Sequence, residues 1–271
     1  MQFALNHMTT PNLSFTDFVG LAHKLGCVGI EARNDIERPL FDGMSSVDAG
    51  NLVSQSGLRL VGLSQVYPFN TWDAEREAAV LSLITTAKQA GAETISLIPR
   101  NDGTELADGE RQQNLRKAMA AILPMLQDVD MVALVEPLGF LRSSLRSKAE
   151  LVDVIDALDG AAHFKLVHDT FHHTLAGGGQ IFPEYTRIVH ISGVVDPALA
   201  VDQMEDEHRV LVDKEDRLGN IAQIQALIDA GYDGSISYEC FSPKTHGLKD
   251  PYSEIKRSFE FISDSLRRRA A

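Results

Sequence analysis

Four ionisable residues stand at the ends of four short apolar runs, and their types are those of metal ligands. They are Glu136, Asp169, His190 and Glu239, at the ends of the runs VALVE, FKLVHD, RIVH and SISYE. A charged group at the end of a buried strand is unfavourable unless a partner neutralises it. Two Glu, one Asp and one His form a mixed oxygen and nitrogen ligand set. This set suits a divalent cation such as Mn²⁺, Co²⁺, Mg²⁺ or Zn²⁺.

A cation held by these side chains would leave positions open for the oxygen atoms of a substrate. It would act as a Lewis acid that polarises a carbonyl group and stabilises an enediolate. Two carboxylates beside such a cation could also move protons to and from a substrate carbon. The residue types therefore predict a catalytic metal site.

The elements that must position these residues alternate along the whole chain. Eight strand-like apolar runs are expected at 3–6, 28–31, 58–63, 94–98, 131–136, 164–169, 188–191 and 235–239. Helical periodicity or capping residues mark the segments 14–25, 73–90, 108–127, 147–159 and 220–230, and a last helix that begins at Asp250-Pro251.

Eight alternations predict a (β/α)8 TIM barrel that occupies residues 1–271 as one domain. A doubly wound open sheet is the second choice, and the absence of a Gly-rich dinucleotide motif after the first strand disfavours it. The carboxyl ends of barrel strands face one mouth. Strands five to eight would therefore direct all four ligands into one half of that mouth.

Composition restricts the partners of the chain. The 271 residues are 44% hydrophobic, and the net charge is −13. Nucleic acid and anionic membranes both require basic surfaces, so neither is expected as a partner. Cys27 and Cys240 lie in apolar runs without ligand spacing, which fits a reducing cytoplasm, and no signal peptide or membrane span is visible. The sequence leaves open whether the chain forms a homo-oligomer.

Further polar residues near the strand ends are candidates for substrate binding. They are His172, Arg209, His7, Gln65 and Arg100. A ring of hydrogen-bonding groups at one mouth suits a small polyhydroxylated ligand. For His172 and Arg209 the alternative is an ordinary place in a solvated loop.

Two other features favour a structural interpretation. His168 precedes Asp169 in the same strand, so its side chain should point out of the barrel interior into the packing around it. The stretch Gly177-Gly178-Gly179 could cradle a phosphate. Three glycines without a preceding strand and a following helix are more typical of a flexible loop.

The motifs around these residues resemble those of the xylose-isomerase-like sugar isomerase and epimerase superfamily. The resemblance covers the whole chain in strand order. It rests on Val135-Glu136-Pro137-Leu138, on His168-Asp169-Thr170-Phe171-His172, on Val189-His190-Ile191 and on Tyr238-Glu239. Within the superfamily the chain is most similar to the inosose isomerases, through its opening Phe3-Ala-Leu-Asn6, its Asp169-x-Phe-His172 segment and its Asp-Glu-x-Arg209-Val210 segment.

This resemblance implies one bound divalent metal ion, Mn²⁺ before Co²⁺, Mg²⁺ or Zn²⁺, with Glu136, Asp169, His190 and Glu239 as its ligands. It also implies that Glu136 and Glu239 are the acid and base. The implied reaction interconverts 2-keto-myo-inositol and 1-keto-D-chiro-inositol through a cis-enediolate. Two departures concern the substrate side: Val212-Asp213-Lys214-Glu215 replaces a Gly-rich stretch, and His7 replaces a carboxylate.

Several other functions use the same barrel and stay open at this point. They are a ketose 3-epimerase, a hydroxypyruvate-type isomerase, a lyase similar to dehydroshikimate dehydratase, and a binding protein without catalysis. An apurinic-site endonuclease shares the fold as well. The acidic charge of this chain argues against it, because such an enzyme needs a basic face for DNA.

Overall fold

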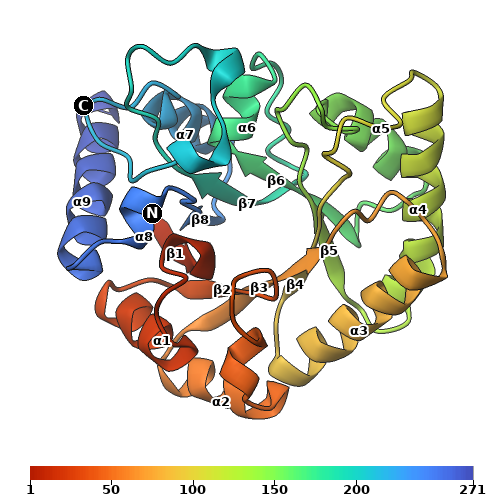
Figure 1. The fold of residues 1–271 in the computed structure, drawn as a ribbon, viewed down its shortest axis with the longest axis horizontal. Coiled ribbons are helices and arrows are strands. Elements are labelled where there is room, and N and C mark those ends of the chain that lie inside the picture. Colours follow the sequence, from red (N-terminus) through yellow and green to blue (C-terminus); the bar gives the residue numbers. More distant parts are fainter. Residues whose placement is uncertain (271) are drawn as a thin grey trace.

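Eight parallel strands close into a barrel in the computed structural model, which describes residues 1–270 (Figure 1). Each strand pairs with the next along the chain, and β8 pairs with β1. The strands are β1 (Gln2–Asn6), β2 (Gly29–Arg33), β3 (Arg59–Val66), β4 (Thr94–Leu97), β5 (Val132–Val135), β6 (Phe164–Asp169), β7 (Thr186–Ile191) and β8 (Ser235–Tyr238). The predicted TIM barrel is confirmed, and the open doubly wound sheet is wrong.

Helices surround the barrel (Figure 1); α1 to α7 lie between successive strands, and α8 and α9 follow the last strand. They are α1 (Phe15–Lys24), α2 (Ser46–Gln55), α3 (Ala74–Ala90), α4 (Glu110–Gln127), α5 (Lys148–Ala157), α6 (Thr170–Leu175), α7 (Asn220–Asp229), α8 (Pro243–His246) and α9 (Pro251–Ala270). Short 3₁₀ turns lie at His7–Thr9, Leu40–Gly43, Val201–Gln203 and Asp206–His208. Within residues 1–270, no helix combines the length and the apolar character that crossing a membrane requires.

Three of these helices were not predicted from the sequence. Helix α2 buries only Ala49 and Val53, so its apolar face is too narrow to stand out. Helices α6 and α8 have six and four residues, too few for a periodic pattern. Helix α6 begins directly at Asp169, whose side chain caps it.

The hydrophobic core has two main layers. Inside the barrel, a small cluster comprises Ala4, Val61, Leu134, Val167 and Ile188. A larger cluster fills the space between the barrel and the helices. His168 belongs to this outer space, because its ring contacts Lys148 of α5 and Gln223 of α7. The predicted outward direction of His168 is therefore confirmed.

Apolar packing also supports the loops at the carboxyl mouth of the barrel. Phe140, Phe171 and Met204 lie there in a separate buried cluster. The loop after β5 packs tightly on α6, since a Cβ atom on Gly139 would lie 2.4 Å from the carbonyl oxygen of His172. A side chain at Gly139 would therefore push the loop away from this helix.

His7 lies in the packing between β1 and α1. Its ring stacks on Phe18 with 4.2 Å between centroids, and its Nε2 donates to the carbonyl oxygen of Leu13 at 3.1 Å. The ring is 3% exposed, and burial lowers the pKa of His7 to about 4. The structure does not support the predicted contact of His7 with substrate, because the ring is turned into the core.

Replacing His7 with Phe should reduce the amount of folding stability that the protein loses at acidic pH. The folded pKa lies below the ordinary value, so the unfolded chain takes up the proton first. The stability that the neutral His7 ring contributes is thus present above about pH 6.5 and is lost as the pH falls towards 4. The loss reaches about 3 kcal/mol at most. Urea unfolding at pH 7 and at pH 4.5 should show a smaller drop for His7→Phe than for the wild type.

The same replacement at the exposed His23 provides the control. It should leave the pH dependence of unfolding unchanged. Parallel losses of stability in the wild type and in His7→Phe would show that His7 does not titrate in this way.

Candidate metal centre and active site

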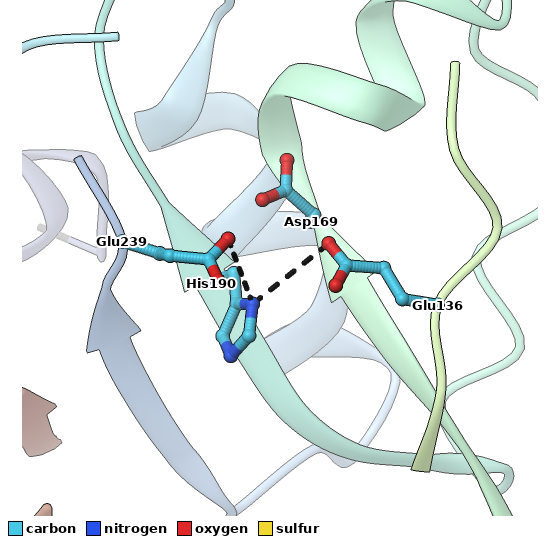
Figure 2. A group of neighbouring side chains, drawn as sticks. All are labelled: Glu136, Asp169, His190 and Glu239. Atoms are coloured by element: carbon cyan, nitrogen blue, oxygen red, sulfur yellow. Dashed lines mark ion pairs between the residues drawn. The ribbon is translucent and has the colours of Figure 1, made fainter. Parts of the chain in front are cut away.

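Four side chains converge at the carboxyl ends of β5 to β8 (Figure 2). Asp169 ends β6, and His190 lies in β7. Glu136 and Glu239 are the first residues after β5 and β8. Each offers one ligand atom, and these atoms all lie within 4.8 Å of one another. The structure thus brings the complete predicted ligand set together, and all four residues are buried.

Strand register explains this convergence. Asp169 is paired with His190 across β6 and β7, and His190 is paired with Ser237 across β7 and β8. Side chains two positions apart on an extended strand point to the same side. Glu239 therefore follows Ser237 on the side that faces the barrel axis.

Glu31 of β2 orients the imidazole of His190 from across the barrel. Its two oxygens lie 3.0 and 3.2 Å from Nε2 of His190, and Ser237 Oγ donates to one of them at 2.6 Å. A carboxylate accepts, so Nε2 carries the hydrogen and Nδ1 faces the cluster. Gly62 of β3 makes room for this carboxylate, since a Cβ there would lie 3.3 Å from its oxygen.

The cluster fits a cation because two of its polar atoms have no partner. His190 Nδ1 lies 3.4 Å from Glu239 and 3.8 Å from an oxygen of Glu136. Neither this Nδ1 nor this oxygen of Glu136 forms a hydrogen bond to any part of the chain that the structure describes. Orphaned buried polar atoms are costly. A divalent cation bound among them would satisfy both.

Two buried arginines balance part of the negative charge. Arg209, 1% exposed, donates through Nη2 to Asp169 at 2.5 Å and to Glu239 at 3.0 Å. Arg33 of β2 binds the other oxygen of Glu239 and both oxygens of Asp35, at 2.7 and 2.8 Å. Both oxygens of Glu239 are thus held by guanidinium groups.

Arg33 was not predicted as a site residue, although a signal for it exists. It stands two positions after Glu31 in β2, and this spacing places both side chains on the same side of the strand. Glu31 was not predicted as a site residue either. Its contact with His190 depends on the opposite wall of the barrel.

The surroundings shift the pKa values of Glu136 and Glu239 in opposite directions. Burial raises the pKa of Glu136, and the nearby Glu239 carboxylate raises it further. Burial also raises the pKa of Glu239, but His190 and the two arginines outweigh it and hold this pKa well below its ordinary value. For His190, burial lowers the pKa while Glu31 and Glu239 lift it well above the ordinary value. Without a cation, the cluster therefore attracts positive charge.

A cavity of about 210 Å³ opens over the cluster. Its lining includes Glu136, Glu239, Arg33, Arg209, Asp35, Gln65, Asn101, Asp206, His172, Ile98, Leu138 and the aromatic rings of Tyr67, Phe140 and Phe241. The predicted residues His172, Gln65 and Arg209 therefore lie where a ligand would bind. His172 Nε2 is 4.0 Å from Glu136, and Gln65 donates to Asp35 at 2.9 Å.

Arg100 does not reach this cavity. Its guanidinium group binds Glu105 at 2.6 Å and Thr104 at 3.1 Å, within the loop that follows β4. The next residue, Asn101, lines the cavity instead. The predicted role of Arg100 is not supported, because carboxylates of its own loop hold its side chain away.

Comparisons with known proteins agree with this architecture. A family model described as a xylose isomerase-like TIM barrel matches residues 19–265. A crystal structure of a xylose isomerase domain containing protein from Salmonella typhimurium LT2 is 30% identical, with a TM-score of 0.89 over 98% of this chain and 97% of that chain. No characterised protein in a curated collection matches the sequence.

Two more distant structures share the fold. The IolI protein, solved with a bound zinc atom, is 18% identical with a TM-score of 0.85 over 99% of both chains. D-psicose 3-epimerase from Clostridium cellulolyticum H10, solved with D-tagatose, is 13% identical with a TM-score of 0.74. That match covers 98% of this chain and 99% of the other. At these identities the likeness concerns the fold.

Replacing Glu31 with Gln should weaken metal binding without removing any of the four ligands. A neutral amide supports the imidazole less strongly than a carboxylate, and such supporting groups are typically worth ~10- to 100-fold in metal affinity. Calorimetric titration of the metal-free protein with Mn²⁺ and with Zn²⁺ measures the change. The control is Glu93→Gln, which alters a carboxylate bound to Arg59 and Arg187 elsewhere in the barrel. Equal affinities for both variants and the wild type would remove Glu31 from the metal site.

Proposed function

Because the chain belongs to the xylose isomerase-like TIM barrel family, we propose that it is a divalent-metal-dependent isomerase or epimerase of a small neutral keto polyol. The observation that carries this proposal is the pair of glutamates at the mouth. Glu136 and Glu239 approach the ligand cluster from β5 and β8, and both line the cavity. A carbonyl compound bound there would have a carboxylate on either side.

The residues that would hold the cation are Glu136, Asp169, His190 and Glu239. When bound, the cation supplies Lewis acidity that polarises the carbonyl and stabilises negative charge on neighbouring substrate oxygens. Mn²⁺ is the metal that we favour, with Co²⁺, Mg²⁺ and Zn²⁺ as alternatives, since the mixed set of carboxylates and imidazole accepts each of them.

The two glutamates would perform the proton transfer. Arg33 and Arg209 hold Glu239 in its ionised form, which suits it to take a proton from the carbon beside the carbonyl. The electron pair of the broken C–H bond forms the cis-enediolate. The same proton, or one from Glu136, then returns to a carbon of the enediolate, while a hydroxyl proton passes between the two oxygens. His172, 4.0 Å from Glu136, is placed to bind a substrate hydroxyl.

The charged residues that line the cavity favour a substrate that carries neither a phosphate nor a carboxylate group. Arg33 and Arg209 are the arginines that line the cavity, and both are already bound to carboxylates. The other polar groups of the lining include Gln65, Asn101 and Asp206, which suit hydroxyl groups. An anionic substrate would face Asp35 and Asp206, while both arginines of the lining are already paired with carboxylates.

A keto-inositol is the substrate that we favour within this class. The motifs around Asn6, His172 and Arg209 resemble those of inosose isomerases. The rings of Tyr67, Phe140 and Phe241 add apolar surface against which the C–H faces of a six-carbon ring can pack. The reaction would convert 2-keto-myo-inositol into 1-keto-D-chiro-inositol.

Proton exchange in D₂O, followed by NMR, tests this proposal directly. The Mn²⁺-loaded protein is incubated with 2-keto-myo-inositol and, separately, with ketohexoses, hydroxypyruvate and dehydroshikimate. We expect deuterium beside the carbonyl of the inosose, appearance of the 1-keto isomer, and loss of both on chelation. Exchange with another ketone alone would replace the substrate and keep the proton-transfer mechanism. Absence of exchange with every compound would contradict the proposed activity.

Replacing Glu239 with Gln should reduce turnover by at least ~100-fold, because an amide cannot accept the carbon-bound proton. Circular dichroism and thermal unfolding should show that the barrel still folds, and metal analysis should report how much cation remains bound. The exposed Glu215→Gln is the matched control and should keep wild-type turnover. Near-normal turnover of Glu239→Gln with its metal bound would rule out Glu239 as the base.

A further inference from the structure

A second and larger cavity lies beside the candidate active site. Its volume is about 490 Å³, and it lies among the loops after β5 and β6 and the start of α5. Its lining includes Arg146, Lys148, His172, His173 and the rim glycines Gly178 and Gly179. His172 also lines the cavity over the metal cluster, so both cavities border this residue.

Lys148 is a buried cation of this cavity without a carboxylate partner. Its side chain is 9% exposed, and its Nζ lies 3.1 Å from His168 Nδ1 and 2.8 Å from His173 Nδ1. No ion pair connects Lys148 to a carboxylate within residues 1–270. An ammonium group has three hydrogens, and the two imidazoles accept only two of them.

The hydrogen bonds around Lys148 show that His168 acts as an acceptor. Gln223 donates its amide hydrogens to the carbonyl oxygens of Thr170 and Leu218, so its Oε1 must accept from Nε2 of His168. His168 Nδ1 is then a lone pair directed at Lys148. Burial, together with the nearby Lys148, lowers the pKa of His173 to about 4, so this ring is neutral as well.

A second cation, Arg146, also lacks a carboxylate. Its Nε and Nη2 donate to the carbonyl oxygens of Gly139 and Leu175, at 2.9 and 3.2 Å. Arg111 is different, because Glu150 neutralises it within the same lining. Two basic side chains without a carboxylate contact therefore line this cavity, in a protein whose net charge is −13.

The glycine stretch forms part of the rim of this cavity. Gly177, Gly178 and Gly179 have φ values of 90°, 79° and 106°, in the region that favours glycine. The N–H groups of Gly177 and Gly178 bond back to Thr174 and His173 of α6. The stretch thus begins as a turn that is hydrogen-bonded to α6.

We propose that this cavity binds a small oxyanion, a phosphate or carboxylate group, on Lys148 with Arg146 and His173 around it. Such an anion would accept the remaining hydrogen of Lys148 and supply the counter-charge that the lining lacks. Burial lowers the pKa of Lys148 to about 7, and a bound anion would favour its charged form. The occupied cavity would touch His172, the residue that it shares with the metal cavity.

Calorimetric titration of the metal-loaded protein with inorganic phosphate, and separately with acetate, tests the proposal. Lys148→Met removes the ammonium group and keeps the length of the side chain. Its affinity for the preferred anion should fall by about tenfold or more, since hydrogen bonds to charged groups contribute that much. Tighter binding of phosphate or of acetate by the wild type identifies the class of oxyanion. A titration with chloride at equal ionic strength measures the nonspecific effect of adding an anion.

The control variant is Lys88→Met, which removes the same charge from the exposed surface of α3. It should bind the anion as the wild type does, which separates the cavity from the general effect of charge. If the anion bound at the metal instead, the wild type, Lys148→Met and Lys88→Met would all have the same affinity for it. Equal affinities for the wild type and Lys148→Met, or no binding by the wild type, would overturn the proposal.

A second measurement uses only the wild-type protein and covers the case in which Lys148→Met fails to fold. Phosphate or acetate is added while the imidazole nitrogen resonances are followed by NMR. We expect the resonances of His173 and His172 to shift with the bound fraction, and those of the exposed His23 to stay in place. Unchanged His173 resonances at saturating anion would exclude the site.

Discussion

Charge neutralisation at the carboxyl mouth of the barrel is the constraint on which the site depends. Four buried carboxylates, those of Glu31, Glu136, Asp169 and Glu239, share this space with two buried arginines and His190. Each buried charge has lost its water and needs a partner of opposite sign. Both arginines are already bound to carboxylates, and orphaned atoms remain on Glu136 and His190. A divalent cation would complete the balance, which explains why so much negative charge is tolerated there.

Closure of the barrel is what makes this balance possible. Arg33 and Glu239 are 206 positions apart, and Glu31 and His190 are 159 positions apart, yet each pair is in direct contact. Because β1 pairs with both β2 and β8, the ends of β2 and β8 lie close together on either side of β1. The second strand therefore supplies both a support for the histidine and a counter-charge for Glu239. An open sheet would separate these partners and leave the ligands unsupported.

The two cavities that meet at His172 differ in electrostatic character. The smaller one contains carboxylates, paired arginines and polar amides, and suits a cation with a neutral polyol. The larger one contains Lys148 and Arg146 without carboxylate partners. One short helix connects them, since α6 is capped by Asp169 of the candidate metal site, carries His172 and ends near the glycine turn.

Local chemistry in the sequence was sufficient to predict the barrel and its four metal-type ligands, because apolar alternation defines strands and each ligand ends one of them. The contacts of the longer side chains depended on the tertiary structure. His7 turned into the core and Arg100 turned to Glu105, whereas Arg33, unnoticed in the sequence, reached Glu239. Lys148 likewise acquired its histidine partners only through packing of α5 on β6. The reason is physical: strand position follows from local pattern, but the partner of a flexible charged group depends on distant segments that folding brings within reach.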